Sequence, residues 1–209
     1  MIAASLSSTL ELYGIHYLAY RINISVICHE VAHGYVARIF GDDTAEKAGR
    51  LTLNPIPHID MLGSIILPAI LILTHSQVVL GWAKPVPVNA YNLHNPKKDM
   101  IWVSLAGIVT NLVLALVFSL ISHVTTNVLL YNICFYGVLY NIILAVFNLI
   151  PIPPLDGSRV VSGLLPPRQA YEYSKVEPYG ILVIFLLLYL GMFDFIFKGL
   201  SPLFKLLLG

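Results

Sequence analysis

The pentapeptide His29-Glu30-Val31-Ala32-His33 places three ionisable side chains inside a run of apolar residues, and this feature most constrains the fold. Residues four apart on an α-helix are separated by about 40° of rotation and about 6 Å of rise. His29 and His33 therefore point the same way and can share one metal ion. An ionisable residue within a membrane segment costs about 3 kcal/mol, so it usually faces a cavity or a partner. The pattern predicts a helix that carries a site.

The residue types in this pattern indicate the chemistry of that site. Neutral imidazoles at this spacing suit Zn²⁺. Glu30 lies on a neighbouring face of the helix, and a carboxylate that is not itself a ligand can take a proton from an activated water molecule. The pentapeptide therefore predicts a zinc hydrolase site with Glu30 as the general base.

The composition indicates an integral membrane protein. The chain has 209 residues, of which 57% are hydrophobic and 11% are charged, and its mean hydropathy is +0.80. A soluble domain of this length is normally about one quarter charged. The net charge of +1 gives no reason to expect a nucleic-acid partner. The stretch from Met1 to Leu10 lacks the basic region of a cleavable signal peptide, so we expect insertion as the intact chain.

Apolar stretches separated by polar loops predict an all-α polytopic membrane protein with five to six transmembrane helices. We expect a single membrane-embedded domain over residues 1–209, with Pro68 as a tolerated kink in one span. The five predicted spans are Leu12 to Phe40, Met61 to Leu80, Ile101 to His123, Val128 to Ile150 and Tyr179 to Phe197.

The segment Lys84-Pro85-Val86-Pro87-Val88-Asn89 is predicted to be extended. Two prolines two residues apart rule out a regular helix, and their alternation with valine favours an extended backbone. Such a segment either lies at the membrane interface or enters a cavity lined by protein.

The distribution of basic residues predicts the orientation of the spans. The loop between the third and fourth spans has no Lys or Arg, whereas basic residues precede the third span and follow the fourth. By the positive-inside rule, the third span starts and the fourth ends in the cytoplasm. Basic residues after the first span place its end there too, so the second span would have both ends inside. Either a half-span kinked at Pro68 or a return pass through Trp82 to Asn89 would resolve this, and both alternatives remain open.

A candidate third ligand follows the fourth span. The sequence from Asn148 to Gly157 contains three prolines within four residues, which break the helix near the bilayer and hold Asp156 at a defined depth. A catalytic zinc needs three protein ligands and one open position. Asp156 would complete a set with His29 and His33, the alternative being an ordinary Asp-Gly turn.

Together, the histidine pentapeptide and the stretch from Asn148 to Gly157 resemble the site-2 protease family of intramembrane zinc metalloproteases. The resemblance covers about residues 22 to 165, and no inserted PDZ-like domain or nucleotide-binding module is visible, so the minimal branch of the family is indicated. Ile108 and Ser158 depart from residues common in the family but leave the ligands intact. Further matching stretches are Gly49 to Pro55, His58 to Asp60, Gly81 to Asn89, and Ala106-Gly107 with Asn111.

The resemblance implies specific roles for individual residues. It implies one Zn²⁺ per chain, held by His29, His33 and Asp156, with Glu30 as the general base. Asn111 and Asn148 match positions that line the cleft and help to hold the substrate strand or its oxyanion. For these two residues, interhelical hydrogen bonding is an equally good interpretation.

We therefore expect a protease that cleaves a transmembrane protein substrate within or beside a membrane helix, in the plasma membrane of a prokaryote and near its cytoplasmic face. Because a helical substrate hides its carbonyl groups, it must unwind before attack, and the extended segment is expected to pair with it by β-addition. The residues expected to bind substrate in this way are Pro85, Val86, Pro87 and Val88. The alternatives are a catalytically silent scaffold that binds transmembrane segments, and a zinc transporter, in which Glu30 would be redundant.

Overall fold

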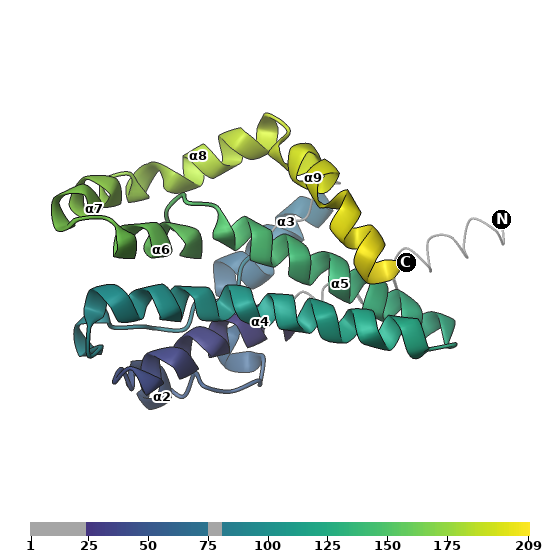
Figure 1. The fold of residues 1–209 in the computed structure, drawn as a ribbon, viewed down its shortest axis with the longest axis horizontal. Coiled ribbons are helices and arrows are strands. Elements are labelled where there is room, and N and C mark those ends of the chain that lie inside the picture. The colour runs from purple at the N-terminus through teal and green to yellow at the C-terminus, as the bar shows by residue number, and fades with distance from the viewer. Residues whose placement is uncertain (1–23, 75–80) are drawn as a thin grey trace.

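The computed structural model describes residues 24–74 and 81–209, and this part of the chain is helical with no β-strand (Figure 1). Its first helix, residues 24–39, carries the two histidines and is called the motif helix below. The part of the first predicted span before residue 24, and the end of the second at residues 75–80, lie outside the described residues. The further elements are α2 (Thr44–Lys47), η1 (Ile56–His58), η2 (Met61–Ile66), α3 (Leu67–Leu73), η3 (Ala90–Asn92), α4 (Pro96–Val124), α5 (Val128–Leu149), α6 (Asp156–Leu164), α7 (Pro167–Ser174), α8 (Glu177–Tyr189) and α9 (Met192–Leu208).

Helix α4 is the central element of this arrangement. It contacts α5, α6, α9 and η3, and Figure 1 shows it running along the length of the fold. The motif helix packs on α4 and runs antiparallel to it, because His33 meets Val103 near the start of α4 whereas His29 meets Asn111 further along.

Helices α4 and α5 form a hairpin of two membrane-length helices, as predicted. Both are long and apolar enough to cross a bilayer. At about 1.5 Å per residue, even the shorter helix, α5, extends over about 33 Å, compared with about 30 Å for the hydrocarbon core. The side chain of Asn95 caps α4 by accepting from the Lys98 amide, and that of Asn127 caps α5 by accepting from the Leu130 amide. These caps explain why both helices begin where they do.

The second predicted span is not one full-length helix. Residues Met61–Ile66 form a π-helical turn, which continues into the short helix Leu67–Leu73. Together they are too short to cross the hydrocarbon core. The Trp82 amide donates to the Gly63 carbonyl at 3.2 Å, and the Ser64 hydroxyl donates to the Trp82 carbonyl at 2.8 Å. Trp82 thus lies beside Gly63 and Ser64, at the beginning of this helical stretch. This favours a half-span kinked at Pro68 over a return pass through Trp82 to Asn89.

The span predicted from Tyr179 to Phe197 is not one continuous helix. The structure divides this stretch into α8 and α9 at Gly191, whose φ of 88° lies in the left-handed region. Glycine adopts this conformation without a steric penalty, so it ends α8 and turns the chain. Helix α9 then packs its apolar side on the α4–α5 hairpin, where the Ser119 hydroxyl donates to the Leu207 carbonyl at 2.6 Å. Hydropathy alone does not reveal this turn.

The proline-containing segment at residues 81–89 has no regular secondary structure, as predicted, and is held at several points. The Lys84 amide donates to the His58 carbonyl at 2.8 Å. The buried Arg50 guanidinium donates through Nη2 to the carbonyls of Lys84 and Pro85, at 2.7 and 3.1 Å. We refer to residues 81–89 as the extended segment. These contacts fix it beside the motif helix.

Asp42 joins the end of the motif helix to the end of the extended segment. Its side chain is fully buried and accepts hydrogen bonds from the amide and hydroxyl of Thr44, the amide of Asn89 at 2.6 Å and the side chain of Asn92 at 3.0 Å. Burial alone would raise the pKa of Asp42, but these hydrogen bonds hold it below its ordinary value. The ionised carboxylate therefore stabilises this junction.

We predict that Asp42→Asn lowers the thermal unfolding midpoint of the detergent-solubilised protein at neutral pH. Hydrogen bonds to a charged group contribute about 1.5–3 kcal/mol each. Because folding lowers the pKa of Asp42, this stabilisation is fully present above the unfolded value near 3.9 and is lost as pH falls through the folded value. Midpoints measured between neutral and acid pH should therefore converge for wild type and variant.

The neighbouring Asp43 provides a matched control. Its carboxylate pairs with Lys47 at 2.7 Å, but both side chains are largely exposed. Exposed pairs contribute about 1 kcal/mol or less, so Asp43→Asn should leave the midpoint nearly unchanged. Equal losses in the two variants would contradict the role assigned to Asp42.

Candidate metal centre

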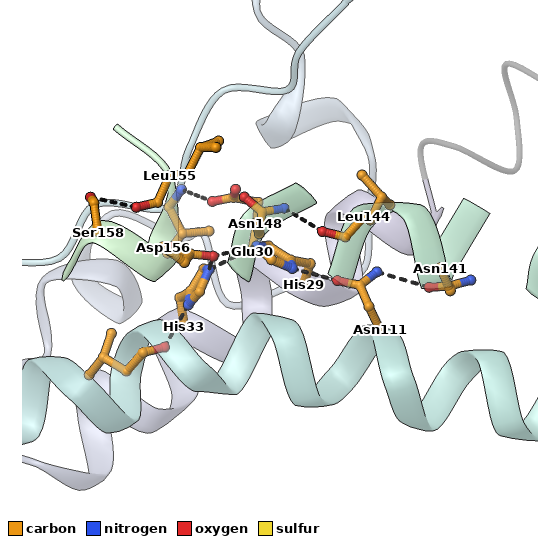
Figure 2. Close-up of polar contacts among 12 residues, drawn as sticks. His29, Glu30, His33, Asn111, Asn141, Leu144, Asn148, Leu155, Asp156 and Ser158 are labelled. Carbon is orange, nitrogen blue, oxygen red and sulfur yellow. Dashed lines mark hydrogen bonds and ion pairs between the residues drawn. The ribbon is translucent and has the colours of Figure 1, made fainter. Parts of the chain in front are cut away.

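The motif helix presents His29 and His33 toward α4, with their rings converging on one point (Figure 2). Their exposed fractions are 6% and 8%, and their Nε2 atoms lie 3.0 Å apart. The rings stand edge to face, with centroids 4.6 Å apart. Helical spacing of four thus brings two potential ligand atoms together in a buried position.

Asp156 reaches the same point from the start of α6. Its Oδ2 atom lies 3.0 Å from His29 Nε2 and 3.1 Å from His33 Nε2. Gly157 allows this approach, because a Cβ atom there would lie 2.2 Å from the Leu149 carbonyl oxygen. The turn from α5 into α6 therefore needs glycine next to Asp156.

Both histidines use their other ring nitrogen, Nδ1, to bind α4. His33 Nδ1 lies 2.6 Å from the Val103 carbonyl oxygen, and His29 Nδ1 lies 2.5 Å from Asn111 Oδ1. Because a carbonyl oxygen can only accept, each Nδ1 carries the proton. This tautomer leaves an Nε2 lone pair on each ring, directed at Asp156.

Three lone-pair atoms at 3.0–3.1 Å repel one another unless a positive charge lies among them. Asp156 Oδ2 is buried and has no aligned hydrogen-bond donor among the described residues. Ligands of a tetrahedral zinc, each about 2.1 Å from the metal, are separated by about 3.4 Å, close to the spacing found here. The three residues thus fit a zinc ion and leave the fourth position to water or substrate.

Gly107 of α4 sets how closely the two imidazoles approach this helix. A Cβ atom at this position would lie 2.5 Å from His29 Cε1 and 2.6 Å from His33 Nε2. Contacts this short cannot be accommodated without moving the rings. The glycine therefore makes room for the ligand pair.

Glu30 lies beside the three ligands and is bound to the extended segment. Its Oε2 accepts the Val86 amide proton at 2.8 Å, and its side chain is partly buried. It is not among the residues whose atoms form the candidate metal cluster, which consists of His29, His33 and Asp156. Glu30 therefore stays outside the candidate metal cluster, with Oε2 bound to the Val86 amide.

The residues predicted to bind substrate fall in three different places. Asn111 is fully buried behind His29, and its Nδ2 donates to Asn141 Oδ1 at 2.9 Å. Asn148 is partly buried, and its Nδ2 donates to the Leu144 carbonyl at 3.0 Å. Pro85, Val86, Pro87 and Val88 lie in the extended segment, where the Val86 amide meets Glu30.

Two residues next to the site received no role from the sequence. Asn141 of α5 contacts Asn111, and Arg50 holds the carbonyls of the extended segment. An asparagine within an apolar span usually makes an interhelical hydrogen bond, so Asn141 could have been singled out on that ground. Its partner could not, because that depends on how α4 and α5 are aligned.

Comparison with known proteins finds a family match and several relatives. The family model described as "Peptidase family M50" matches residues 124–191. The chain is 39% identical over 183 residues to YwhC of Bacillus subtilis, named "Putative zinc metalloprotease", with 82% of this chain and 79% of the relative covered. It is 31% identical to Rip2 of Mycolicibacterium smegmatis, which has the same description, with 79% and 63% covered. It is 25% identical to "Zinc metalloprotease MJ0392" of Methanocaldococcus jannaschii, with 72% and 35% covered.

These relatives differ in length from the chain. It covers most of the Bacillus protein but less than two thirds of the Mycolicibacterium and Methanocaldococcus proteins. No solved structure matches the chain significantly.

We predict that Gly107→Ala weakens zinc binding by roughly tenfold or more, because the added methyl group displaces the imidazoles. Zinc affinity would be measured by competition with a chromogenic chelator. Gly199→Ala in α9 is the control, since no atom lies within 4 Å of the added Cβ there. Equal zinc affinity in wild type and both variants would show that the close approach at Gly107 is not required.

Proposed function

Because the chain belongs to peptidase family M50, the site-2 proteases, and is a zinc metalloprotease, we propose that it hydrolyses a peptide bond within or beside a transmembrane helix of a protein substrate. The observation that carries this proposal is the buried convergence of His29, His33 and Asp156 within 3.1 Å, with Glu30 beside them. All three proposed ligands belong to one chain, so we propose one zinc ion per chain.

The proposed setting is the plasma membrane of a prokaryote, with the site near the cytoplasmic face. The two membrane-length helices, α4 and α5, support an intramembrane position, and the relatives come from bacteria and archaea. The charge distribution supports the orientation, since it places the start of α4 and the end of α5 in the cytoplasm. In this topology, the stretch from Met61 to Leu73 enters the membrane without crossing it.

The proposed reaction assigns proton transfer to Glu30. When bound, zinc supplies Lewis-acid activation of a water molecule and of the scissile carbonyl group. Glu30 accepts the proton of the attacking water and later delivers it to the leaving amine. The Val86 amide keeps the carboxylate pointed at the site by binding Oε2. His29 and His33 are held in the ligating tautomer by their contacts with α4.

The extended segment is the proposed docking edge for an unwound substrate strand. Several of its polar backbone groups are engaged: the Lys84 amide by His58, the Lys84 and Pro85 carbonyls by Arg50, and the Val86 amide by Glu30. Among the described residues, the Val88 amide has no hydrogen-bond partner. Amides two residues apart point to the same side of an extended chain, so the Val88 amide lies on the same edge as the Val86 amide.

Substitutions at Glu30 and Asp156 distinguish the proposed general base from a proposed metal ligand. We predict that Glu30→Gln retains zinc and loses cleavage by roughly 10²–10⁴-fold, since it removes only the proton acceptor. Asp156→Asn should lose both zinc and cleavage. Zinc stoichiometry and proteolysis of a single-span substrate, measured on the same preparations, test this. Full cleavage by Glu30→Gln would contradict the mechanism and favour another base, whereas loss of zinc in that variant would make Glu30 a ligand.

A second test separates substrate docking from the position of Glu30. Val88→Pro removes the unengaged amide, so we predict slower cleavage, through a higher KM, with zinc binding unchanged. Val86→Pro removes the amide that holds Glu30, so it should lower kcat. Unchanged kinetics in Val88→Pro would rule out β-addition at this amide.

A further inference from the structure

A buried hydrogen-bond relay connects His29 to Asn141 of α5 through Asn111 of α4. His29 Nδ1 contacts Asn111 Oδ1 at 2.5 Å, and Asn111 Nδ2 donates to Asn141 Oδ1 at 2.9 Å (Figure 2). Asn141 Nδ2 donates to the Gly137 carbonyl at 2.8 Å and to the Ser25 hydroxyl at 2.9 Å. Both asparagines are fully buried. The relay thus crosses three helices and returns to the motif helix at Ser25, one turn before His29.

The direction of every hydrogen bond in this relay follows from its far end. The Gly137 carbonyl can only accept, so the amide nitrogen of Asn141 must face it. The oxygen of Asn141 then faces Asn111 and requires a donor, which orients the nitrogen of Asn111 toward it. The oxygen of Asn111 consequently faces His29 and accepts the Nδ1 proton.

The fixed orientation of the Asn111 amide determines which ring nitrogen of His29 carries no proton. An Asn111 amide turned by 180° would present its NH₂ group to Nδ1 and favour a proton on Nε2 instead. An Nε2 that carries a proton has no lone pair for a metal ion. Asn111 alone can adopt either orientation, so the choice depends on Asn141.

We propose that Asn141 is a positioning residue that acts through Asn111 to hold His29 in its metal-binding tautomer. The inference rests on the proposed zinc site, to which it adds a residue that touches neither the metal ligands nor the substrate. His33 has no need of such a relay, because its Nδ1 binds a backbone carbonyl, whose direction is fixed by α4 itself. The side-chain amide behind His29 can rotate, and Asn141 prevents that rotation.

The test is a double-mutant cycle on zinc affinity. Asn141→Leu removes the relay while keeping a side chain of similar size. Asn111→Asp places a carboxylate behind His29. Both carboxylate oxygens can accept from His29 Nδ1, so this side chain favours the same tautomer whichever way it is turned. Ser119→Ala is the control, because Ser119 is a buried residue of α4 that also makes an interhelical hydrogen bond, to Leu207, without contacting the relay. Affinities are measured with zinc alone against a chelator.

We expect Asn141→Leu to weaken zinc binding by roughly 10–100-fold, the usual effect of losing an outer hydrogen bond to a metal ligand. In the Asn111→Asp background, where the Asn141 oxygen already lacks its donor, the same substitution should cause no further loss of zinc affinity, and Ser119→Ala should bind zinc like the wild type. Equal losses from Asn141→Leu in both backgrounds would show a general packing role and overturn the proposal. So would wild-type affinity in Asn141→Leu.

A spectroscopic measurement on the wild type keeps the proposal testable if Asn141→Leu fails to fold. In zinc-free protein with ¹⁵N-labelled histidine, at a pH of about 9 where an ordinary imidazole is neutral, the ring nitrogen shifts report the tautomer. We expect His29 to carry its proton on Nδ1, and a proton mainly on Nε2 would overturn the proposal. A wild-type chain that binds no zinc contradicts the proposed function itself, whereas zinc binding that is insensitive to Asn141 contradicts only this inference.

Discussion

Mutual repulsion among three lone-pair atoms is the constraint on which the rest of the structure depends. The Nε2 atoms of His29 and His33 and the Oδ2 atom of Asp156 lie 3.0–3.1 Å apart in a buried position. Because these atoms repel one another, other contacts must hold each side chain in place. Helix α4 supplies most of that support, through the Val103 carbonyl, the Asn111 amide and the space left by Gly107. The central position of α4 follows from this role. The cation that relieves the repulsion is therefore bound by a site already shaped by helix packing.

The sequence predicts the convergence of the three proposed ligands because their spacing is local. A separation of four residues aligns His29 with His33 on any helix, and the prolines before Asp156 end a helix wherever they occur. Hydropathy likewise identifies α4 and α5, whose lengths match a bilayer. It does not identify the break at Gly191, because the residues on either side are equally apolar. The contact between Asn111 and Asn141 is also not predictable, since it depends on how the two helices are aligned.

The extended segment links two parts of the site that the sequence treats separately. Its Val86 amide holds Glu30, and the Val88 amide on the same edge is the proposed docking place of the substrate. Arg50 and Asp42 fix the segment from opposite ends, one through carbonyls and the other through the Asn89 amide. Anchors at both ends leave little freedom for the residues between them. Displacement of the segment would therefore disturb proton transfer and substrate alignment together.

The order of the ligands along the chain has a consequence for biosynthesis. The motif helix emerges early, whereas Asp156 follows the whole α4–α5 hairpin. A nascent chain that ends before α6 has the two imidazoles but lacks Asp156. A chain that ends before α4 also lacks the partners that set the tautomers of these imidazoles. The metal centre is thus assembled only when most of the chain has been inserted. A truncated or stalled product would therefore lack part of the proposed hydrolytic site.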